Sequence, residues 1–291
     1  MNSKIMILQP VSWKEHDAPY VVDVYGRTHE GDIARVRLTG FKPYFYLDFN
    51  KLDDLKKIRT KNGFEPKYTI EKVKKYSIME FSVEKDVYKI SFDTLWGYKL
   101  CSKLSGYESN FPPYLKLIHD LNLNPASPFE FPSKDKKTGT YDLYEVSYIL
   151  VKPAKSLIPL YIMSYDLEVY SSEGFPVSSE PTSEIMQIGI STRWTDNLLE
   201  PIERFVLVVG EGKSKDCIWC SSEKDLLMKF QDLIKVEEPD ILTGYNTFGF
   251  DDGYLYDRFQ KYHLNIDIGR EETNLVTKTF ELASGKYAVR Y

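Results

Sequence analysis

The sequence has few of the residues that mark several protein classes. Cysteine occurs three times and histidine four times in 291 residues. Cys101 is isolated, whereas Cys217 and Cys220 form one Cys-x-x-Cys pair, too little for a disulfide framework and only half of a zinc-site signature. We therefore expect structural thiols in a protein of a reducing, intracellular setting. No apolar run approaches the roughly 18 residues of a membrane-spanning helix, so we expect no membrane partner.

An excess of positive charge is also lacking. The chain has 38 Lys and Arg against 43 Asp and Glu, a formal net charge of −5 at pH 7. This balance argues against a protein that holds nucleic acid on a broad basic surface. It does not exclude an enzyme that acts on DNA through clustered carboxylates and metal ions. With 42% hydrophobic and 28% charged residues, the composition is that of a folded globular protein.

The length suits two modest domains of mixed α/β (α+β) type, and a proline-containing stretch over 128–159 predicts domains 1–150 and 151–291. The first half is rich in short β-branched and aromatic runs, and the second alternates strands with amphipathic helices. In the first domain we expect strands at 20–25, 34–38, 44–47, 67–73 and 79–83, and helices at 51–61 and 94–104. In the second we expect strands at 160–169, 185–192, 205–210 and 241–245, and helices at 222–236 and 251–263.

The sharpest chemical feature is Asp166-Leu167-Glu168, at the end of an apolar strand. Residues i and i+2 of a strand face the same side, so Asp166 and Glu168 project together. Two adjacent carboxylates repel each other unless a cation lies between them, and oxygen ligands suit Mg²⁺ or Mn²⁺. The alternative is an exposed strand end with two solvated acids, because Asp-x-Glu triplets are common.

A second feature is the segment GYNTFGFDDGYL, in which a strand ends, a glycine-containing turn follows and Asp251 opens a helix. Asp251 is either a helix-capping acid, which the helix dipole favours, or a third carboxylate for the same metal site. Asn246 would then offer its amide to a substrate strand. Phe250 is either a stacking ring for the substrate or a ring of the core.

Several segments resemble family B DNA polymerases. SYDLEVYSSEGFPVSSEPTSEIMQIGI is similar to their Exo I region, and PDILTGYNTFGFDDGYLYDR is similar to their Exo II region. RLTGFKPYFYL and SFDTLWGYKLCSKLSGYESNFPPYLKLIHDLNLNP resemble the amino-terminal domain of the delta-type and large-DNA-virus branch. SEKDLLMKFQDLIKVEEPDILTGYN is similar to the helix between the two Exo regions. The similarity covers most of residues 10–260 in the expected order.

This resemblance implies a β-rich amino-terminal domain followed by a ribonuclease-H-like 3′→5′ exonuclease domain. Asp166 and Glu168 match the Exo I pair that binds the catalytic metal, and Asp251 matches the Exo II carboxylate of the second metal. Asn246 and Phe250 become candidate substrate-binding residues. The implied reaction is proofreading by two-metal hydrolysis with Mg²⁺ or Mn²⁺ in a replicative polymerase, a nucleotidyltransferase. The implied partners are a single-stranded 3′ end, primer–template DNA, the remainder of the polymerase and a processivity factor, in the nucleus or at a viral replication site.

The sequence departs from the family pattern after Asp251. The Exo III pattern, Tyr-x-x-x-Asp, does not occur between this residue and Tyr291, and the polymerase motifs do not occur either. We therefore expect the front part of a longer enzyme, with an incomplete exonuclease domain that alone is weakly active or inactive. Two alternatives are a free-standing 3′→5′ exonuclease and a non-enzymatic DNA-binding and docking half of a split polymerase.

Overall fold

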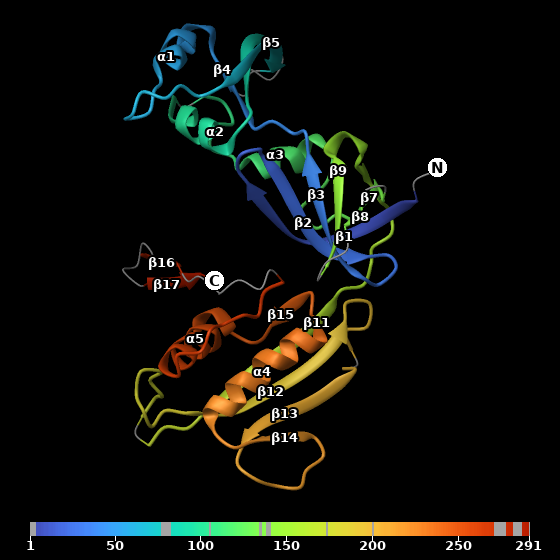
Figure 1. Ribbon diagram of the computed structural model, residues 1–291, viewed down its shortest axis with the longest axis vertical. Helices are drawn as coiled ribbons and strands as arrows, with labels where there is room; N and C mark the ends of the chain where they lie inside the picture. The colour runs from blue at the N-terminus through green and yellow to red at the C-terminus, as the bar shows by residue number, and fades with distance from the viewer. Residues whose placement is uncertain are drawn as a thin grey trace. The chain divides into compact units, whose positions relative to one another are not determined.

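The chain divides into two compact units, Met1–Ile158 and Pro159–Tyr291 (Figure 1). The computed structural model describes residues 4–76, 83–104, 106–133, 136–137, 141–172, 174–199, 201–270, 278–281 and 287–290. The division falls eight residues after the boundary proposed from the sequence. Strand β10 (Lys152–Pro153) pairs with β7 (Phe129–Pro132) and so ties the intervening residues to the first unit. Within the described ranges, the helices are all too short or too polar to cross a membrane.

The first unit is built on a seven-stranded sheet with the order β10-β7-β1-β2-β3-β9-β8. Along β3 the residues Ala34, Val36 and Leu38 are buried and their neighbours are half-buried. This period of two explains why the segment forms a strand with one covered face. The remaining strands of this sheet are β1 (Ile5–His16), β2 (Val21–Thr28), β3 (Ile33–Thr39), β8 (Lys136–Lys137) and β9 (Asp142–Ser147).

A three-stranded sheet with the order β4-β6-β5 and three short α-helices complete the first unit. Phe45 of β4 and Phe92 of β6 are fully buried, and their rings stack with centroids 5.5 Å apart. Residues 79–82 of a predicted strand lie outside the described part of the chain, and the strand that pairs here is β6. These elements are β4 (Tyr44–Leu47), β5 (Tyr68–Tyr76), β6 (Glu84–Phe92), α1 (Leu52–Lys57), α2 (Leu95–Cys101) and α3 (Pro113–Asp120).

The second unit is built on a five-stranded sheet with the order β14-β13-β12-β11-β15, and helix α4 crosses one of its faces (Figure 1). Tyr165 and Leu167 of β11 lie in the same apolar core as Leu226 and Phe230 of α4. The elements are β11 (Tyr161–Val169), β12 (Ile185–Trp194), β13 (Glu203–Val209), β14 (Cys217–Cys220), α4 (Glu223–Glu237), β15 (Ile241–Thr243), α5 (Asp251–Lys261), β16 (Lys278–Glu281) and β17 (Tyr287–Arg290).

Helix α4 has the limits that its sequence predicts. The Ser222 hydroxyl accepts a hydrogen bond from the Asp225 N–H at 3.2 Å, and the Asp225 carboxylate accepts one from the Ser221 N–H at 2.8 Å. The first bond satisfies the free Asp225 N–H of the first turn, and the second ties the residue before the cap to the helix, as in a capping box. At the other end Glu238 adopts a left-handed conformation with φ 46°, and Pro239 follows. Proline cannot continue a helix, so the chain leaves α4 toward β15.

The topology brings the two sequence features to one edge of the sheet. Strand β11 runs parallel to β15, with Ser164 paired to Thr243. Because parallel strands end at the same edge, the acidic end of β11 lies beside the turn that follows β15. The next residue in that turn, Gly244, approaches β11 closely: a Cβ placed on it would lie 2.3 Å from the backbone oxygen of Tyr165 and 2.5 Å from Cγ2 of Thr247.

This close approach predicts the effect of Gly244→Ala. The added methyl group cannot be accommodated without moving the β11 backbone, so we expect the free energy of unfolding of the second unit to fall by about 1–3 kcal/mol. Gly189→Ala on β12 is the matched control, because a Cβ there meets nothing within 4 Å. Thermal unfolding of both variants checks the prediction, and equal melting temperatures would contradict it.

Candidate active site

The two acids of the Asp-x-Glu triplet lie on the exposed face of β11. Asp166 and Glu168 are exposed, whereas the residues on either side of each point into the core or toward it. Across the antiparallel pair, Asp166 lies opposite Gly189 and Glu168 lies opposite Gln187 of β12. Since Gly189 has no side chain, the sheet surface beside Asp166 is hollow. The shared face that the spacing predicts is therefore present, with open space next to it.

Asp251 lies against the same stretch of backbone. It is the first residue of α5 and is 4% exposed. Its carboxylate accepts a hydrogen bond from the N–H of Leu167 at 3.2 Å, at the residue between Asp166 and Glu168. Burial raises the pKa of Asp251 above its usual range, and the charges of Asp166 and Asp252 add to this against the opposing backbone hydrogen bonds. A cation at this position would relieve the repulsion that these acids exert on one another.

The neighbouring acid, Asp252, has a different role. The Tyr165 hydroxyl donates a hydrogen bond to its carboxylate, and the Tyr165 ring packs on Phe230 of α4 with centroids 5.3 Å apart. Asp252 therefore anchors the start of α5 to the inner face of the sheet. Of the two consecutive acids, only Asp251 reaches the backbone of the Asp-x-Glu triplet.

The fit of these residues to a divalent cation can be judged from their chemistry and position. Three carboxylates around one backbone position are the oxygen donors that Mg²⁺ and Mn²⁺ take. Within the residues that the structure describes, no three His, Cys, Asp or Glu side chains are gathered closely enough to hold a metal ion. The three carboxylates are therefore donors of the type that a hard cation takes, but they are not gathered into a closed set of ligands.

Asn246 shapes the turn between β15 and α5. It is exposed and adopts a left-handed backbone conformation with φ 55°. Its carbonyl oxygen accepts hydrogen bonds from the N–H groups of Gly249 at 2.9 Å and Phe250 at 3.2 Å. Asparagine tolerates this conformation better than most residues, so part of its role is structural. Its side-chain amide lies against Gly249, where an added Cβ would be 2.3 Å from Asn246 Oδ1, and it stays a candidate for contact with substrate.

The predicted aromatic residue, Phe250, is half-buried. Its ring packs between Phe175 and Tyr254, with centroid distances of 5.6 and 5.2 Å. Two other rings of the same turn, Tyr245 and Phe248, are 91% and 85% exposed. The sequence analysis did not single these two out, because only the folded turn distinguishes a free ring from a packed one.

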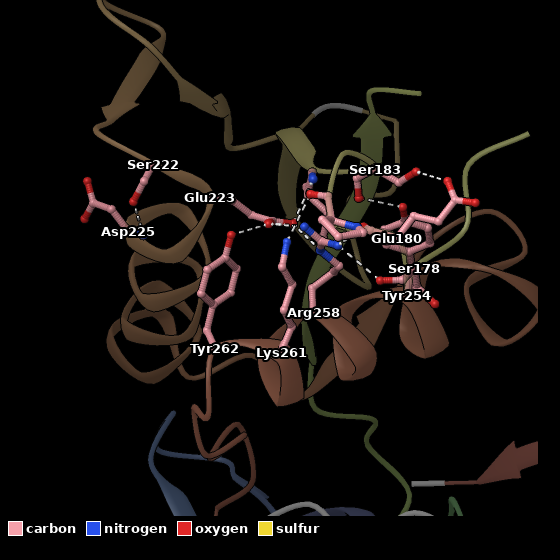
Figure 2. A network of polar contacts seen from close by, with 12 residues as sticks. Ser178, Glu180, Ser183, Ser222, Glu223, Asp225, Tyr254, Arg258, Lys261 and Tyr262 are labelled. Atoms are coloured by element: carbon pink, nitrogen blue, oxygen red, sulfur yellow. Dashed lines mark hydrogen bonds and ion pairs between the residues drawn. The ribbon is translucent and has the colours of Figure 1, made fainter. Parts of the chain in front are cut away.

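A buried ion pair ties both helices to the loop that follows β11 (Figure 2). Arg258 of α5 and Glu223 of α4 are fully buried, and Nε of Arg258 donates to Oε1 of Glu223 at 2.6 Å. Arg258 also donates to the carbonyl oxygens of Ser178 at 3.1 Å and Glu180 at 2.8 Å. The other partner of Oε1 of Glu223 is the N–H of Ile185, where β12 begins, at 2.9 Å. The pair thus holds both ends of the loop segment 178–185.

Two tyrosines complete this network (Figure 2). The Tyr254 hydroxyl donates to the carbonyl oxygen of Ser183, and the Tyr262 hydroxyl donates to the Glu223 carboxylate, each at 2.8 Å. Burial, together with the hydrogen bond and charge of Glu223, raises the pKa of Tyr262 to about 12. Tyr262 therefore keeps its proton, and its donor role, at all ordinary pH values.

The two cysteines of the Cys-x-x-Cys pair lie at opposite ends of one short strand. Cys217 and Cys220 are free thiols at the two ends of β14, Cys217 half-buried and Cys220 buried. Residues three apart in a strand point to opposite faces, so the two thiols do not converge. Burial raises the pKa of the Cys101 thiol to about 11, which keeps this group protonated and unreactive.

Residues 104–288 match the model of the family described as "DNA polymerase family B, exonuclease domain". The chain belongs to this family. It is 28% identical to a DNA polymerase of Acanthamoeba polyphaga mimivirus over 84% of this chain and 17% of that protein. It is 27% identical to the DNA polymerase catalytic subunit of Saimiriine herpesvirus 2, over 88% of this chain and 28% of the relative. It is 26% identical to the DNA polymerase delta catalytic subunit of Plasmodium falciparum, over 82% of this chain and 26% of that protein.

The fold of this family B chain agrees with a solved structure. The family B DNA polymerase of Pyrobaculum calidifontis superimposes with a TM-score of 0.70 and 19% sequence identity, covering 97% of this chain and 35% of the archaeal one. The mixed α/β architecture with a β-rich first part is therefore confirmed, as is the viral and delta-type branch of the resemblance. The chain spans less than a third of the length of the mimivirus, herpesvirus and Plasmodium polymerases.

In this family B chain, the structure places all three sequence-predicted acids at one edge of the sheet. The sequence analysis missed the Arg258–Glu223 pair and the exposed ring of Tyr245. One signal for the pair was present: Arg258 follows Tyr254 by four residues and lies beside Leu255 and Phe259 on the buried helix face, where a cation needs a buried partner. Its partner could not be identified, because Glu223 lies 35 residues earlier.

Proposed function

We propose that the chain is the amino-terminal and exonuclease portion of a replicative DNA-directed DNA polymerase, and that its second unit serves 3′→5′ proofreading. The observation that carries this proposal is the hydrogen bond from the Leu167 N–H to the Asp251 carboxylate. It places the acid of the Exo II region at the residue between the two acids of the Exo I region. Membership in the exonuclease-domain family supports the same function.

The roles proposed for the residues agree with their positions. Asp166 and Glu168 would hold Mg²⁺ or Mn²⁺ from a rigid, paired strand, and Asp251 would complete the set from the first turn of α5. When bound, two such ions would supply an activated water for attack on the phosphate of the terminal nucleotide and would stabilise the leaving 3′ oxygen of the penultimate nucleotide. Asn246 would orient the substrate strand through its amide, and Phe250 would support a base at the 3′ end.

The relatives suggest the wider context. Their names describe DNA polymerases, so the substrate proposed here is DNA with a single-stranded 3′ end or a primer–template junction. The partners proposed are the remainder of the polymerase and a processivity factor. The place of action that goes with viral and delta-type relatives is a viral replication site or the nucleus.

Binding of Mn²⁺ tests the proposal. Electron paramagnetic resonance of free Mn²⁺, in a titration with the chain, should show that the wild type binds the ion. Asp166→Asn or Glu168→Gln should weaken this binding at least about 10-fold, because mutating even the residues that hydrogen-bond to metal ligands lowers metal affinity by that factor. Asp232→Asn is the matched control, since this acid is exposed on α4 away from the site. Binding that is absent from the wild type, or equal in all four proteins, would contradict the proposal.

A second measurement addresses the reaction. A single-stranded oligonucleotide labelled at its 5′ end should be shortened slowly or not at all by the chain alone, only with Mn²⁺ present, and never by Asp166→Asn. Shortening that continues in EDTA, or in Asp166→Asn, would place the activity elsewhere. Fast digestion that depends on Asp166 would confirm the site and contradict the expected weakness of the isolated chain.

A further inference from the structure

The first turn of α5 is attached to β11 at two points. At the first point, the Asp251 carboxylate accepts a hydrogen bond from the Leu167 N–H at 3.2 Å. At the second, the Asp252 carboxylate accepts one from the Tyr165 hydroxyl. The residue before the helix, Phe250, has no side-chain oxygen with which to cap the first turn. The two acids therefore make the contacts that determine how the start of α5 lies on the strand.

Each attachment point lies next to an acid of the Asp-x-Glu triplet. Tyr165 directly precedes Asp166, and its side chain lies on the inner face of β11 while that of Asp166 is exposed. Leu167 directly precedes Glu168. A single hydrogen bond would leave the first turn of α5 free to rotate about it. The second bond, two residues along the strand, removes this freedom and fixes the direction of the Asp251 carboxylate relative to Asp166.

Tyr165 is itself held rigidly. It is 7% exposed, and its ring packs on Phe230 of α4 with centroids 5.3 Å apart. Its backbone oxygen would lie only 2.3 Å from a Cβ placed on Gly244. A tyrosine side chain has only two rotatable bonds, so a packed ring brings its hydroxyl to one place. Asp252 is thus bonded to a fixed point of the sheet.

We propose that Tyr165 and Asp252 are positioning residues whose hydrogen bond makes the acid site prefer Mg²⁺ over the larger Ca²⁺. This inference rests on the proposed exonuclease function. Mg²⁺ requires nearly ideal octahedral geometry with oxygens at about 2.0–2.1 Å, whereas Ca²⁺ accepts oxygens at about 2.3–2.6 Å in flexible arrangements. An Asp251 carboxylate held in one direction favours Mg²⁺, and loss of that constraint therefore weakens the binding of Mg²⁺ more than that of Ca²⁺.

The same strand provides a matched control for a purely structural role. The Tyr161 hydroxyl donates a hydrogen bond to the Glu237 carboxylate of α4 at 2.7 Å. Tyr161 lies on the same inner face of β11 as Tyr165, and the acceptors Glu237 and Asp252 are both half-buried. Tyr161→Phe therefore removes the same kind of bond, at the end of the strand away from the acids.

Competition against Mn²⁺ tests the proposal. Electron paramagnetic resonance of free Mn²⁺ measures the concentrations of Mg²⁺ and of Ca²⁺ that displace the bound ion from the chain. Tyr165→Phe should weaken Mg²⁺ binding by about 10-fold, the lower end for groups that orient metal ligands. It should weaken Ca²⁺ binding less, so that the preference for Mg²⁺ falls. Tyr161→Phe should keep the wild-type preference, although it should lower the melting temperature as Tyr165→Phe does.

Two substitutions of Asp252 separate the hydrogen bond from the charge. Asp252→Asn still provides an oxygen that accepts from the Tyr165 hydroxyl, whereas Asp252→Ala does not. Both remove a negative charge near the site, which should lower the affinity for the two divalent ions alike. Only Asp252→Ala should also lower the preference for Mg²⁺. Adding Tyr165→Phe to it should cause no further fall, because the same hydrogen bond is already lost.

A wild-type preference for Mg²⁺ in both Tyr165→Phe and Asp252→Ala would overturn this inference and leave the exonuclease proposal intact. An equal fall in Tyr161→Phe would also overturn it, because the cause would then be a general loss of stability. Asp166→Asn decides the exonuclease proposal separately, since it must weaken Mn²⁺ binding whatever Tyr165→Phe does. A wild-type chain that binds no Mn²⁺ would overturn that proposal and this inference together.

Discussion

Arg258→Met should lower the free energy of unfolding of the second unit by about 3–5 kcal/mol, the cost of leaving a buried charge without its partner. Methionine keeps the apolar stem of arginine but provides no donor. Glu223 would then be buried with only the Ile185 N–H and the Tyr262 hydroxyl as donors. Burial lowers the pKa of Arg258, but the hydrogen bond and charge of Glu223 raise it more, so the pair is ionised in the folded protein.

Calorimetry separates this effect from a general loss of stability. The transition that moves should be the one that Gly244→Ala also moves, because both residues belong to the second unit. The double variant Arg258→Met/Glu223→Gln should recover part of the loss. Its glutamine can still accept from the Ile185 N–H, and no uncompensated charge remains. A single variant that costs less than about 1 kcal/mol would show that water or rearrangement compensates the carboxylate.

The ion pair matters beyond stability because of what it positions. Arg258 lies on the helix that begins with Asp251, and it donates to the carbonyl oxygens of Ser178 and Glu180 in the loop after β11. The same loop carries Phe175, which packs on Phe250. One buried group thus fixes both the helix that supplies Asp251 and the loop that supports the neighbouring ring of Phe250.

The parts of this site that the sequence predicts are those that depend on local periodicity. The spacing of Asp166 and Glu168 defines a shared strand face, and the residues around Ser222 and Pro239 mark the ends of α4. Non-local pairing could not be predicted in the same way. The parallel pairing of β11 and β15 brings Asp251 to Leu167, 84 residues earlier in the chain. This pairing is what places the two separate motifs at the same edge of the sheet.

Exposure was equally hard to predict for single residues. Phe250 and Phe248 lie two positions apart in one turn, yet the first packs between two rings and the second is exposed.

The limit of the first unit depended on β10, whose two residues pair with β7 after a helical turn at 148–150. A pairing of two residues leaves no periodic signal, so composition alone suggested an earlier boundary.

Asp251→Asn should have opposite effects on stability without and with a divalent cation. In EDTA at neutral pH the variant should melt at a higher temperature than the wild type. Burial and the neighbouring acids raise the pKa of Asp251, so the folded state holds this proton more tightly than the unfolded chain does. The stability linked to this proton is present below the unfolded pKa and is lost as the pH rises through the folded pKa. The ionised carboxylate therefore destabilises the fold at pH 7, whereas the neutral amide can still accept from the Leu167 N–H.

Saturating Mn²⁺ should reverse the order of the two melting temperatures, so that the wild type becomes more stable than Asp251→Asn. A cation that binds only the folded state stabilises it by about 2.7 kcal/mol at 100 times its dissociation constant, and the wild type should gain this amount. The variant, with one charged ligand fewer, should gain much less. Asp232→Asn should follow the wild type in both buffers.

A pH series in EDTA adds a further check. The difference in melting temperature between the variant and the wild type must shrink as the solution becomes acidic enough to protonate Asp251. A variant that is less stable than the wild type in EDTA at pH 7 would contradict the electrostatic cost of ionised Asp251. A variant that keeps the full Mn²⁺ shift would remove Asp251 from the metal site. If the variant is the more stable protein in EDTA and the wild type is the more stable one in Mn²⁺, Asp251 is a residue whose charge destabilises the fold and is kept because the cation requires it.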